Sequence, residues 1–379
     1  MHVKYKQFLK ICSTMFLTMI SVVSVAACMA VERPFYKLEE AEQLFENFTA
    51  TYDKTYPDKE EKLKRFQIFK ENLQKINQLN LNSSAVRAVN QFADLTTDEF
   101  VNQYTGVMKP ALREVFSDDC ELVTDFHMQN APDSLDYRGY GVVTPVKSQA
   151  TCASCWAFAA AAVIESHYAM KHHRLVRLSE QQIMDCTVYP FGYGHCNGGG
   201  WPQVAFSQLK QTARGLALED DYPYVVKDQS CPYMDPSKFT VKVTGCTKLR
   251  LSEEALKEAL YYFGPVTVNV NASTWNTYDG HVHSAADCLY ERTPNHAALL
   301  VGYGTTERSE DYWLLKNSFG PQFGEEGYIR ISRGQNACGI VHTDNECYVP
   351  EHFVRCLAAD FPLSCGSQPS TRKYPTIML

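Results

Sequence analysis

The stretch Gln149-Ala-Thr-Cys-Ala-Ser-Cys-Trp-Ala-Phe158 decides how this sequence folds, because it places two cysteines at the start of an Ala-rich run. The run from Cys155 to about Tyr168 predicts a buried helix. A thiol at the amino terminus of a helix feels the positive end of the backbone dipole, which favours the thiolate. We therefore predict that Cys155 is a nucleophile and that Trp156 packs in the core.

The pair Cys152 and Cys155 also suits two other chemistries. A metal site needs a second pair at similar spacing, and the sequence has none. A redox pair is typical of a βαβ unit, whereas this pair opens an Ala-rich helix. Two histidine pairs lack acidic or cysteine neighbours that would complete a ligand set, and we expect them at the surface: His172 with His173, and His281 with His283. We predict neither a metal nor a cofactor.

A nucleophilic thiolate needs a proton partner and a group that orients this partner. His296 begins an apolar run that leads into a Gly turn, and Asn317 follows the next predicted strand. A single histidine is more often structural. The combination of a cysteine, a distant histidine and an asparagine is typical of cysteine peptidases, however, and it predicts that these three residues meet in the fold.

Composition excludes several classes of protein. The 379 residues carry 36 Lys and Arg against 43 Asp and Glu, a net charge of −7, and 45% are hydrophobic. A nucleic-acid binder would show a basic stripe, and a disordered chain would be less apolar, so we expect neither. Fourteen cysteines are many for a reducing compartment. They indicate the secretory pathway, ending in the lysosome or outside the cell.

The amino terminus agrees with export. Three lysines precede an apolar run from about Ile11 to Ala27. We interpret residues 1–30 as a signal peptide, and an uncleaved membrane anchor is the alternative that a span of roughly 20 residues permits. In an exported chain, three tripeptides are candidate glycosylation sites, at Asn47, Asn82 and Asn271.

The remaining chain divides by its sequence pattern. Residues 31–130 form a separate amino-terminal region, which the family resemblance described below identifies as a pro-region; its helical spacing of apolar residues includes Phe66, Phe69, Leu73 and Ile76. Between about 108 and 132 the periodicity stops and acidic residues cluster, which predicts an exposed linker open to proteolysis. A helical half is followed by a half with short β-type runs at Val266–Val270, Ala298–Val301 and Tyr312–Leu315. This order predicts an α+β unit of two lobes over residues 131–349. Residues 350–379 form a C-terminal extension.

These motifs together resemble the papain family of cysteine peptidases, in particular the cathepsin L-like type with an inhibitory pro-region. One pro-region motif is complete, at Glu61, Arg65, Ile68, Phe69, Asn72, Ile76 and Asn80. The second is present at Ala88, Asn90, Phe92 and Asp94, with Ala in the Gly position. The resemblance runs from about Leu38 to about Val349. It implies a two-lobed papain-like fold with an active-site cleft, preceded by a small helical pro-domain.

The resemblance also implies roles for individual residues. Cys155 is the nucleophile, His296 the general acid and base, Asn317 its orienting residue, and Gln149 an oxyanion donor. The implied disulfides are Cys152–Cys196, Cys186–Cys231 and Cys288–Cys338. The implied substrate-binding residues are Gly198, Gly199, Trp201, Asn269, Pro294, Asn295, Ala297 and Thr343. The apolar lining of the second subsite predicts a preference for bulky apolar side chains over Arg.

The implied activity is that of an endopeptidase made as a zymogen. Cys155 and His296 form a thiolate–imidazolium pair, and the His-paired cysteine of papain has a pKa of about 3–4. The partners are protein and peptide substrates, cystatin-like inhibitors and the chain's own pro-region, and we expect a monomer. The pro-region blocks the cleft until low pH releases it, with Asp94 as the candidate trigger. A secreted binding protein with a damaged site is the rival, and the intact catalytic set argues against it.

Several positions depart from the family pattern. Ala150 and Ala153 replace glycines, and an added methyl at Ala153 is expected to narrow the cleft. Phe319 and Phe323 stand where the family has Trp, and Phe covers the Asn–His hydrogen bond less completely. Apart from Cys155 and the implied pairs, the predicted mature chain has four further cysteines: Cys246, Cys347, Cys356 and Cys365. We predict two further bridges that fasten the extension to the body, one through Cys246; a flexible tail trimmed during maturation is the alternative.

Overall fold

The computed structural model describes residues 33–107, 120–124, 130–187, 194–211, 215–232, 235–288, 293–341 and 347–350. Contact density divides the chain into two units, residues 1–33 and 34–379, and all helices and strands described here belong to the second unit. The predicted signal peptide, Thr343 and residues 351–379 lie outside the described residues. Within the described ranges, no helix is long and apolar enough to cross a membrane.

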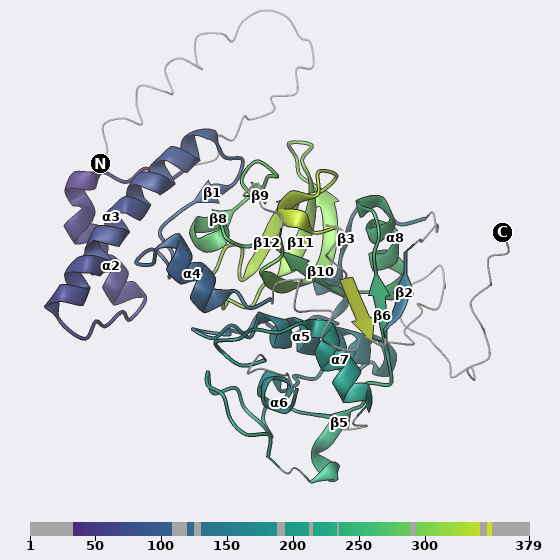
Figure 1. The fold of residues 1–379 in the computed structure, drawn as a ribbon. Helices are drawn as coiled ribbons and strands as arrows, with labels where there is room; N and C mark the ends of the chain where they lie inside the picture. Colours follow the sequence, from purple (N-terminus) through teal and green to yellow (C-terminus); the bar gives the residue numbers. More distant parts are fainter. Residues whose placement is uncertain are drawn as a thin grey trace, which may run out of the picture. The chain divides into compact units, whose positions relative to one another are not determined.

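The pro-region is a small helical unit with its own core (Figure 1). Its elements are the 3-10 helix η1 (Leu38–Glu40), the helices α2 (Ala41–Thr51), α3 (Lys59–Asn82) and α4 (Thr97–Tyr104), and the short strand β1 (Val86–Arg87). Asp58 caps α3 by accepting from the N–H of Glu61, and Thr96 and Glu99 form a capping box on α4. Phe69, Leu73 and Ile76 are fully buried, which confirms the predicted apolar face of α3.

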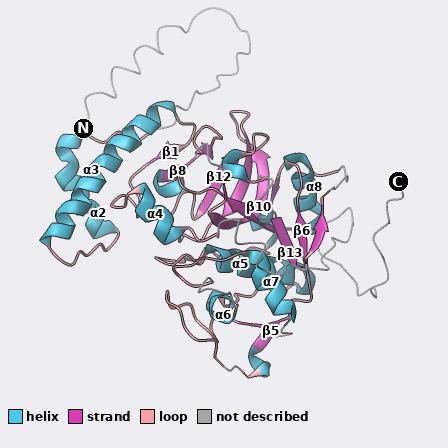
Figure 2. Ribbon diagram, viewed as in Figure 1, coloured by secondary structure: helices cyan, strands magenta, loops and turns pink. Residues whose placement is uncertain are grey.

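One large, mostly antiparallel sheet forms the β-rich half of the catalytic body (Figure 2). Its strands follow the order β2-β6-β13-β7-β10-β11-β12-β9, and β3 pairs with β10. The bounds are β2 (Glu121–Val123), β3 (Leu135–Asp136), β6 (Cys246–Leu249), β7 (Val266–Val270), β9 (Val282–His283), β10 (His296–Thr305), β11 (Asp311–Lys316), β12 (Tyr328–Ser332) and β13 (Cys347–Pro350). The predicted β runs coincide with β7 and lie inside β10 and β11.

Helices cover this sheet and form the other half. The longest is α5 (Cys155–His172), whose Ala-rich faces allow close packing against β10 and β7 as well as α6 and α7. The other elements are α6 (Glu180–Cys186), α7 (Pro202–Gln211), α8 (Glu253–Phe263), the paired strands β4 (Leu216–Ala217) and β5 (Phe239–Val241), β8 (Tyr278–Gly280), and the 3-10 helices η3 (Tyr137–Tyr140), η5 (Pro236–Lys238), η6 (Trp275–Thr277) and η7 (Ala337–Gly339). The predicted two-part α+β fold is confirmed.

Four disulfides stabilise the described chain. Three are the pairings that the family resemblance implies: Cys152–Cys196, Cys186–Cys231 and Cys288–Cys338. The fourth joins Cys246 to Cys120 of the predicted linker. The prediction that Cys246 fastens the C-terminal extension is therefore wrong, because its sulfur is already bonded. The predicted linker is also not wholly irregular, since Glu121–Val123 form β2 beside β6.

The structure corrects one of the predicted glycosylation sites. Asn271 is only 6% exposed, and its side-chain amide donates to the carbonyl of Thr293 over 3.0 Å. A buried amide that is already used in this way offers no nitrogen for a glycan in the folded chain. Asn47 and Asn82 lie exposed on the pro-region helices.

Candidate active site

The nucleophile candidate lies at the junction of the two halves of the catalytic body. Cys155 is the first residue of α5 and is completely buried. Among the cysteines whose side chains the structure describes, it is the one outside a disulfide. The backbone N–H groups of Ala297, Gly106 and Trp156 lie around its sulfur and favour a negative charge there. The helix terminus adds to this effect.

His296 and Asn317 meet because β10 and β11 are neighbouring antiparallel strands. The His296 Nε2 lies 2.8 Å from Asn317 Oδ1, and this oxygen also accepts from the N–H of Ser318 over 2.8 Å. An amide oxygen only accepts, so His296 Nε2 carries the proton. The other ring nitrogen, Nδ1, is buried and has no hydrogen-bond partner among the described residues. It is the nitrogen left free to exchange a proton with a neighbouring group.

Aromatic rings cover the histidine from two sides. The centroid of the Phe319 ring lies 4.8 Å from that of His296, and the Trp275 ring lies 5.6 Å away in an edge-on arrangement. Phe319 and Trp275 are both fully buried. The family pattern predicts Phe319 as cover for the Asn–His bond, whereas Trp275 on η6 carries no sequence signal and was not predicted. Trp275 adds cover beyond that of Phe319.

Gln149 is held by hydrogen bonds at both ends of its amide. Its Oε1 accepts from the Ser318 hydroxyl over 2.6 Å, and its other end faces two carbonyl oxygens, which only accept and so identify that end as the donor. Its Nε2 donates to the carbonyl of Cys152 over 2.7 Å and to the carbonyl of Tyr104 over 3.1 Å. Tyr104 belongs to the pro-region. A pro-region carbonyl therefore occupies a donor that the family resemblance assigns to the reaction.

The pro-region passes directly over the site just after α4. The N–H groups of Gly106 and Val107 both donate to the carbonyl of Asn295 over 2.9 Å, and the Gly106 carbonyl accepts from Gly200 over 2.7 Å. A Cβ on Gly106 would lie 2.0 Å from the carbonyl oxygen of Ala153. Only glycine allows this close approach of two backbones.

This cover determines the charge state of the site in the precursor. Burial raises the pKa of the Cys155 thiol to about 12, although the surrounding N–H groups oppose it. Burial also lowers the pKa of His296 to about 4, against the effect of its bond to Asn317. Both groups are therefore neutral near pH 7. Exclusion of water from both partners thus disfavours the thiolate–imidazolium pair while the pro-region covers the cleft.

Some of the implied substrate-binding residues lie next to the part of the pro-region that crosses the site at Gly106. Gly199, Asn295 and Ala297 lie next to Gly106 or the Cys155 sulfur. Gly198 shares the turn of Gly199, and Asn269 lies opposite Ala297 in the β7–β10 register. Trp201 and Pro294 are buried, and Thr343 lies outside the described residues.

The two Gly-to-Ala departures have different structural consequences. Ala150 has a φ of +49°, a left-handed conformation that disfavours a Cβ, which explains why glycine suits this position. Ala153 is 4% exposed and meets Gly106 through its backbone carbonyl. The backbone carbonyl of Ala153, and not its methyl group, therefore limits the width of the cleft at this point. A glycine at this position would have the same carbonyl.

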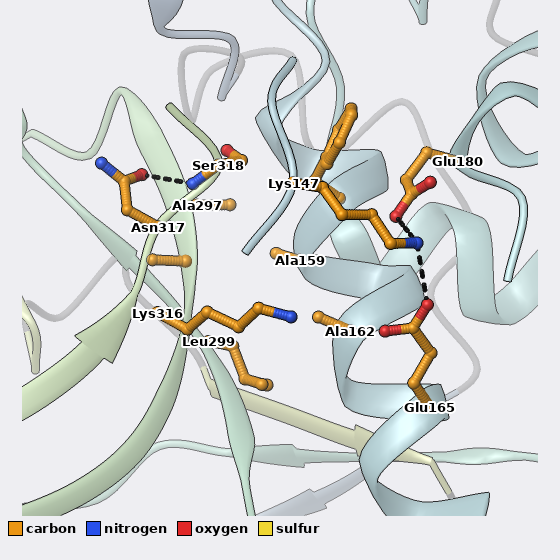
Figure 3. Close-up of a pocket in the computed structure, with 12 residues that line it drawn as sticks. Lys147, Ala159, Ala162, Glu165, Glu180, Ala297, Leu299, Lys316, Asn317 and Ser318 are labelled. Atoms are coloured by element: carbon orange, nitrogen blue, oxygen red, sulfur yellow. Dashed lines mark hydrogen bonds and ion pairs between the residues drawn. The ribbon is translucent and has the colours of Figure 1, made fainter. Parts of the chain in front are cut away.

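A buried charge network joins the segments that carry the site (Figure 3). Lys147 donates to Glu165 over 3.0 Å and to Glu180 over 2.7 Å, and Lys316 donates to the Thr144 hydroxyl over 2.7 Å. Lys147 precedes Gln149 by two residues, Glu165 lies on α5, and Lys316 precedes Asn317. Burial lowers the pKa of Lys316 to about 8, although Glu165 raises it. The network stabilises the two halves against each other.

A second buried cluster fastens the pro-region to the catalytic body. Arg87 on β1 is 1% exposed and places Nη2 3.0 Å from His283 Nδ1 and 3.3 Å from Asp287 Oδ1. Because arginine only donates, His283 Nδ1 is unprotonated here. The expectation that His283 lies at the surface is wrong, since Arg87 and β8 cover it completely. Its sulfur neighbours Cys288 and Cys338 are bonded to each other and offer no thiolate to a metal.

Asp94 has a different environment from His283. It accepts from Lys54 Nζ over 3.0 Å and from the Tyr56 hydroxyl over 3.0 Å, and both partners belong to the pro-region. Asp94 thus stabilises the pro-domain itself. Contact with the body is made instead by the Phe92 ring, which packs on Phe319 at 5.4 Å between centroids.

A thiol at a helix terminus, a histidine held by an asparagine, and a pro-region segment that passes over the site define a cysteine protease in precursor form. Comparisons agree. The family description "Papain family cysteine protease" matches residues 131–348, and "Cathepsin propeptide inhibitor domain (I29)" matches residues 45–100. The chain belongs to the papain family of cysteine proteases, with the pro-region of a cathepsin.

Individual relatives include viral proteins. The chain is 39% identical over 318 residues to the viral cathepsin of Mamestra configurata nucleopolyhedrovirus, covering 83% of this chain and 90% of that one. It is 40% identical over 309 residues to the viral cathepsin of Epiphyas postvittana nucleopolyhedrovirus, covering 80% and 91%. Among solved structures, procathepsin L 3 of the Tenebrio molitor larval midgut matches with a TM-score of 0.71 at 30% identity, covering 82% and 98%. The recombinant stem bromelain precursor matches with a TM-score of 0.70 at 34% identity, covering 82% and 98%.

Proposed function

We propose that Cys155, His296, Asn317 and Gln149 carry out the peptide-bond hydrolysis of this cysteine endopeptidase. The observation that carries the assignment is the 2.8 Å bond from His296 Nε2 to Asn317, which leaves Nδ1 free, while the N–H of the next residue, Ala297, acts on the Cys155 sulfur. Removal of the pro-region admits water to the cleft. Cys155 then transfers its proton to His296 Nδ1, and the helix terminus and nearby N–H groups stabilise the thiolate.

The reaction then runs in two halves. The Cys155 sulfur attacks the peptide carbonyl carbon, and the C=O electron pair moves to the oxygen, which accepts from Gln149 Nε2; one such donor contributes roughly 3–4 kcal/mol. His296 gives its proton to the leaving nitrogen as the C–N bond breaks, which leaves a thioester. His296 next removes a proton from water, the water oxygen attacks the thioester, and the C–S bond breaks to restore the thiolate.

Kinetics of single variants test the assignment. Cys155→Ser and His296→Ala should reduce turnover of a peptide substrate to background. Asn317→Ala should reduce it only in part, because the asparagine orients the histidine but carries no proton. Wild-type turnover by Cys155→Ser would overturn the assignment. Unfolding curves of the three zymogens exclude misfolding as the cause.

We further propose a preference for bulky apolar side chains two residues before the cut. Trp201, Pro294 and Ala297 supply apolar walls, and the family position of Thr343 carries no carboxylate that would hold Arg. A peptide library cleaved by the activated enzyme should show Leu, Phe or Val at that position. A profile dominated by Arg would contradict the proposal.

We also propose a localisation, glycosylation sites, an inhibitor and an oligomeric state for the enzyme. The four disulfides support synthesis in the secretory pathway, with the lysosome or the extracellular space as the destination. Exposure of Asn47 and Asn82 supports glycosylation of the pro-region. We propose that a cystatin-like inhibitor inserts into the same cleft and that the active enzyme is a monomer. Size-exclusion chromatography with and without such an inhibitor tests both.

A further inference from the structure

The segment after the inhibitory part of the pro-region is built into the catalytic body. Its first described residue, Cys120, is 8% exposed and joins the apolar core of the body. Cys120 forms a disulfide with Cys246 at the start of β6, 126 residues further along the chain. A covalent bond therefore connects a residue of the predicted pro-region with the sheet of the catalytic body.

Strand pairing extends this attachment. β2 runs parallel to β6, with Glu121 opposite Thr247 and Val123 opposite Leu249. The Val123 carbonyl accepts from the N–H of Arg250 over 2.9 Å, and its side chain packs on the core. β2 is the last strand in the sheet order, so it covers the outer edge of β6. Its removal would expose unpaired backbone groups of β6 and an apolar contact.

The end of the same segment is held as well. The N–H of Asn130 donates to Glu258 on α8 over 3.2 Å, and the N–H of Ala131 donates to the same carboxylate over 3.0 Å. Ala131 packs against the core. Both described ends of the segment from residue 120 to 131 are therefore fixed to the body. Among the residues that the structure describes before Cys120, by contrast, the last inhibitory contact is made by Val107 in the cleft.

We propose that the active enzyme keeps Cys120 and the edge strand β2 (Glu121–Val123), anchored by the Cys120–Cys246 disulfide, and that the activating cut lies on the amino-terminal side of Cys120. This moves the boundary of the catalytic body from residue 131 to Cys120. A cut after Cys120 would leave the pro-region tethered to the enzyme by the Cys120–Cys246 bond. Tethering keeps an inhibitor at an effective concentration in the millimolar range, so the cleft would stay blocked.

Processing of the full-length precursor tests the proposal. The purified zymogen is incubated at acidic pH, and the product is analysed by amino-terminal sequencing and by intact mass before and after reduction. We expect one chain that begins at or before Cys120, contains the Cys120–Cys246 peptide pair, and loses no fragment on reduction. A product beginning at residue 121 or later would overturn the proposal. Release of the pro-region helices by reduction would overturn it as well.

A second measurement does not depend on the proposed catalytic residues. The full-length Cys155→Ser precursor is digested with subtilisin, and the resistant core is mapped without reduction. Retention of residues 120–123 in the core after loss of α2 to α4 supports the proposal, and loss of residues 120–123 together with α4 overturns it. Failure of wild-type self-processing would count against the proposed activity alone, because this digestion still decides the boundary.

The thermal stability of the processed enzyme shows whether the strand is retained after activation or is attached to the body only in the precursor. The double variant Cys120→Ser/Cys246→Ser is processed by a trace of wild-type enzyme and melted beside processed wild type. We expect its midpoint to fall by roughly 5–10 °C, because the bond closes a long loop in the active enzyme. An unchanged midpoint would contradict the proposal. Should the double variant fail to fold, the wild-type mass analysis still decides.

Discussion

The side-chain amide of Gln149 donates to the backbone carbonyl of Tyr104 over 3.1 Å. A donor suited to an oxyanion is thus occupied by a carbonyl of the chain's own pro-region. The neighbouring Gly106 lies against Ala153 and Asn295, so the backbone of the pro-region fills the space beside Cys155. Inhibition in the precursor follows from backbone contacts at the site and from the exclusion of water around it.

Replacement of Gly106 should loosen this inhibition. In Gly106→Ala, the new Cβ would lie 2.0 Å from the Ala153 carbonyl oxygen and 2.5 Å from its carbon, both backbone atoms that have little freedom to move. Overpacking of this kind costs about 1–3 kcal/mol. We expect the purified zymogen at neutral pH to react roughly 5–150 times faster with a thiol-directed epoxide.

The control for that variant is Gly139→Ala. No heavy atom lies within 4 Å of the Cβ position of residue 139, and its φ is not positive. Its labelling rate should equal that of the wild type. Equal rates for Gly106→Ala and Gly139→Ala would show that the close approach at Gly106 does not control access.

Acid should weaken the attachment of the pro-region through His283. Burial, followed by the charge of Arg87, lowers the pKa of His283 to about 3 in the precursor. An exposed histidine titrates near 6.5. A group with a depressed pKa in the bound state stabilises that state above pH 6.5 and loses this contribution as the pH falls toward 3. Attachment should weaken by up to about tenfold per pH unit in this range.

The variant His283→Gln isolates this proton. Glutamine can still accept from Arg87 but takes up no proton in this range. The rate of pro-region release between pH 6.5 and 4, followed by intact mass, should depend on pH with a slope about one unit smaller than in the wild type. Identical slopes would assign acid sensitivity to other groups, such as the pro-domain carboxylate of Asp94.

Neutralising Glu165 should destabilise the fold. Glu165→Gln leaves Lys147 and Lys316 buried with less negative charge nearby, and breaking a buried ion pair costs about 3–5 kcal/mol. Urea unfolding of the zymogen should show this loss. The exposed pair of Lys37 and Glu40 offers the control, since solvent screens it and Glu40→Gln should leave the unfolding curve unchanged. Equal losses in the two variants would rule out the stabilising role of the network.

The sequence predicted elements whose pattern is local. The Ala-rich run became α5, and Val266–Val270 became β7, because each segment can bury its apolar face in only one way. The Cys120–Cys246 bond was missed because cysteine spacing carries no information about pairing. Burial of His283 was missed because its partner Arg87 lies 196 residues away and the two meet only through docking of β1 on β8.

The most direct test of this account is the labelling of Cys155 by a thiol-directed epoxide before and after removal of the pro-region. The precursor holds this thiol neutral and completely buried, with a pKa raised to about 12 by burial. We expect peptide mapping to find almost no adduct on Cys155 in the zymogen at neutral pH. After acid processing, we expect one adduct per chain, on Cys155, in parallel with the gain of peptidase activity. Full peptidase activity after processing without an adduct on Cys155, or equally fast labelling of the zymogen, would contradict the account.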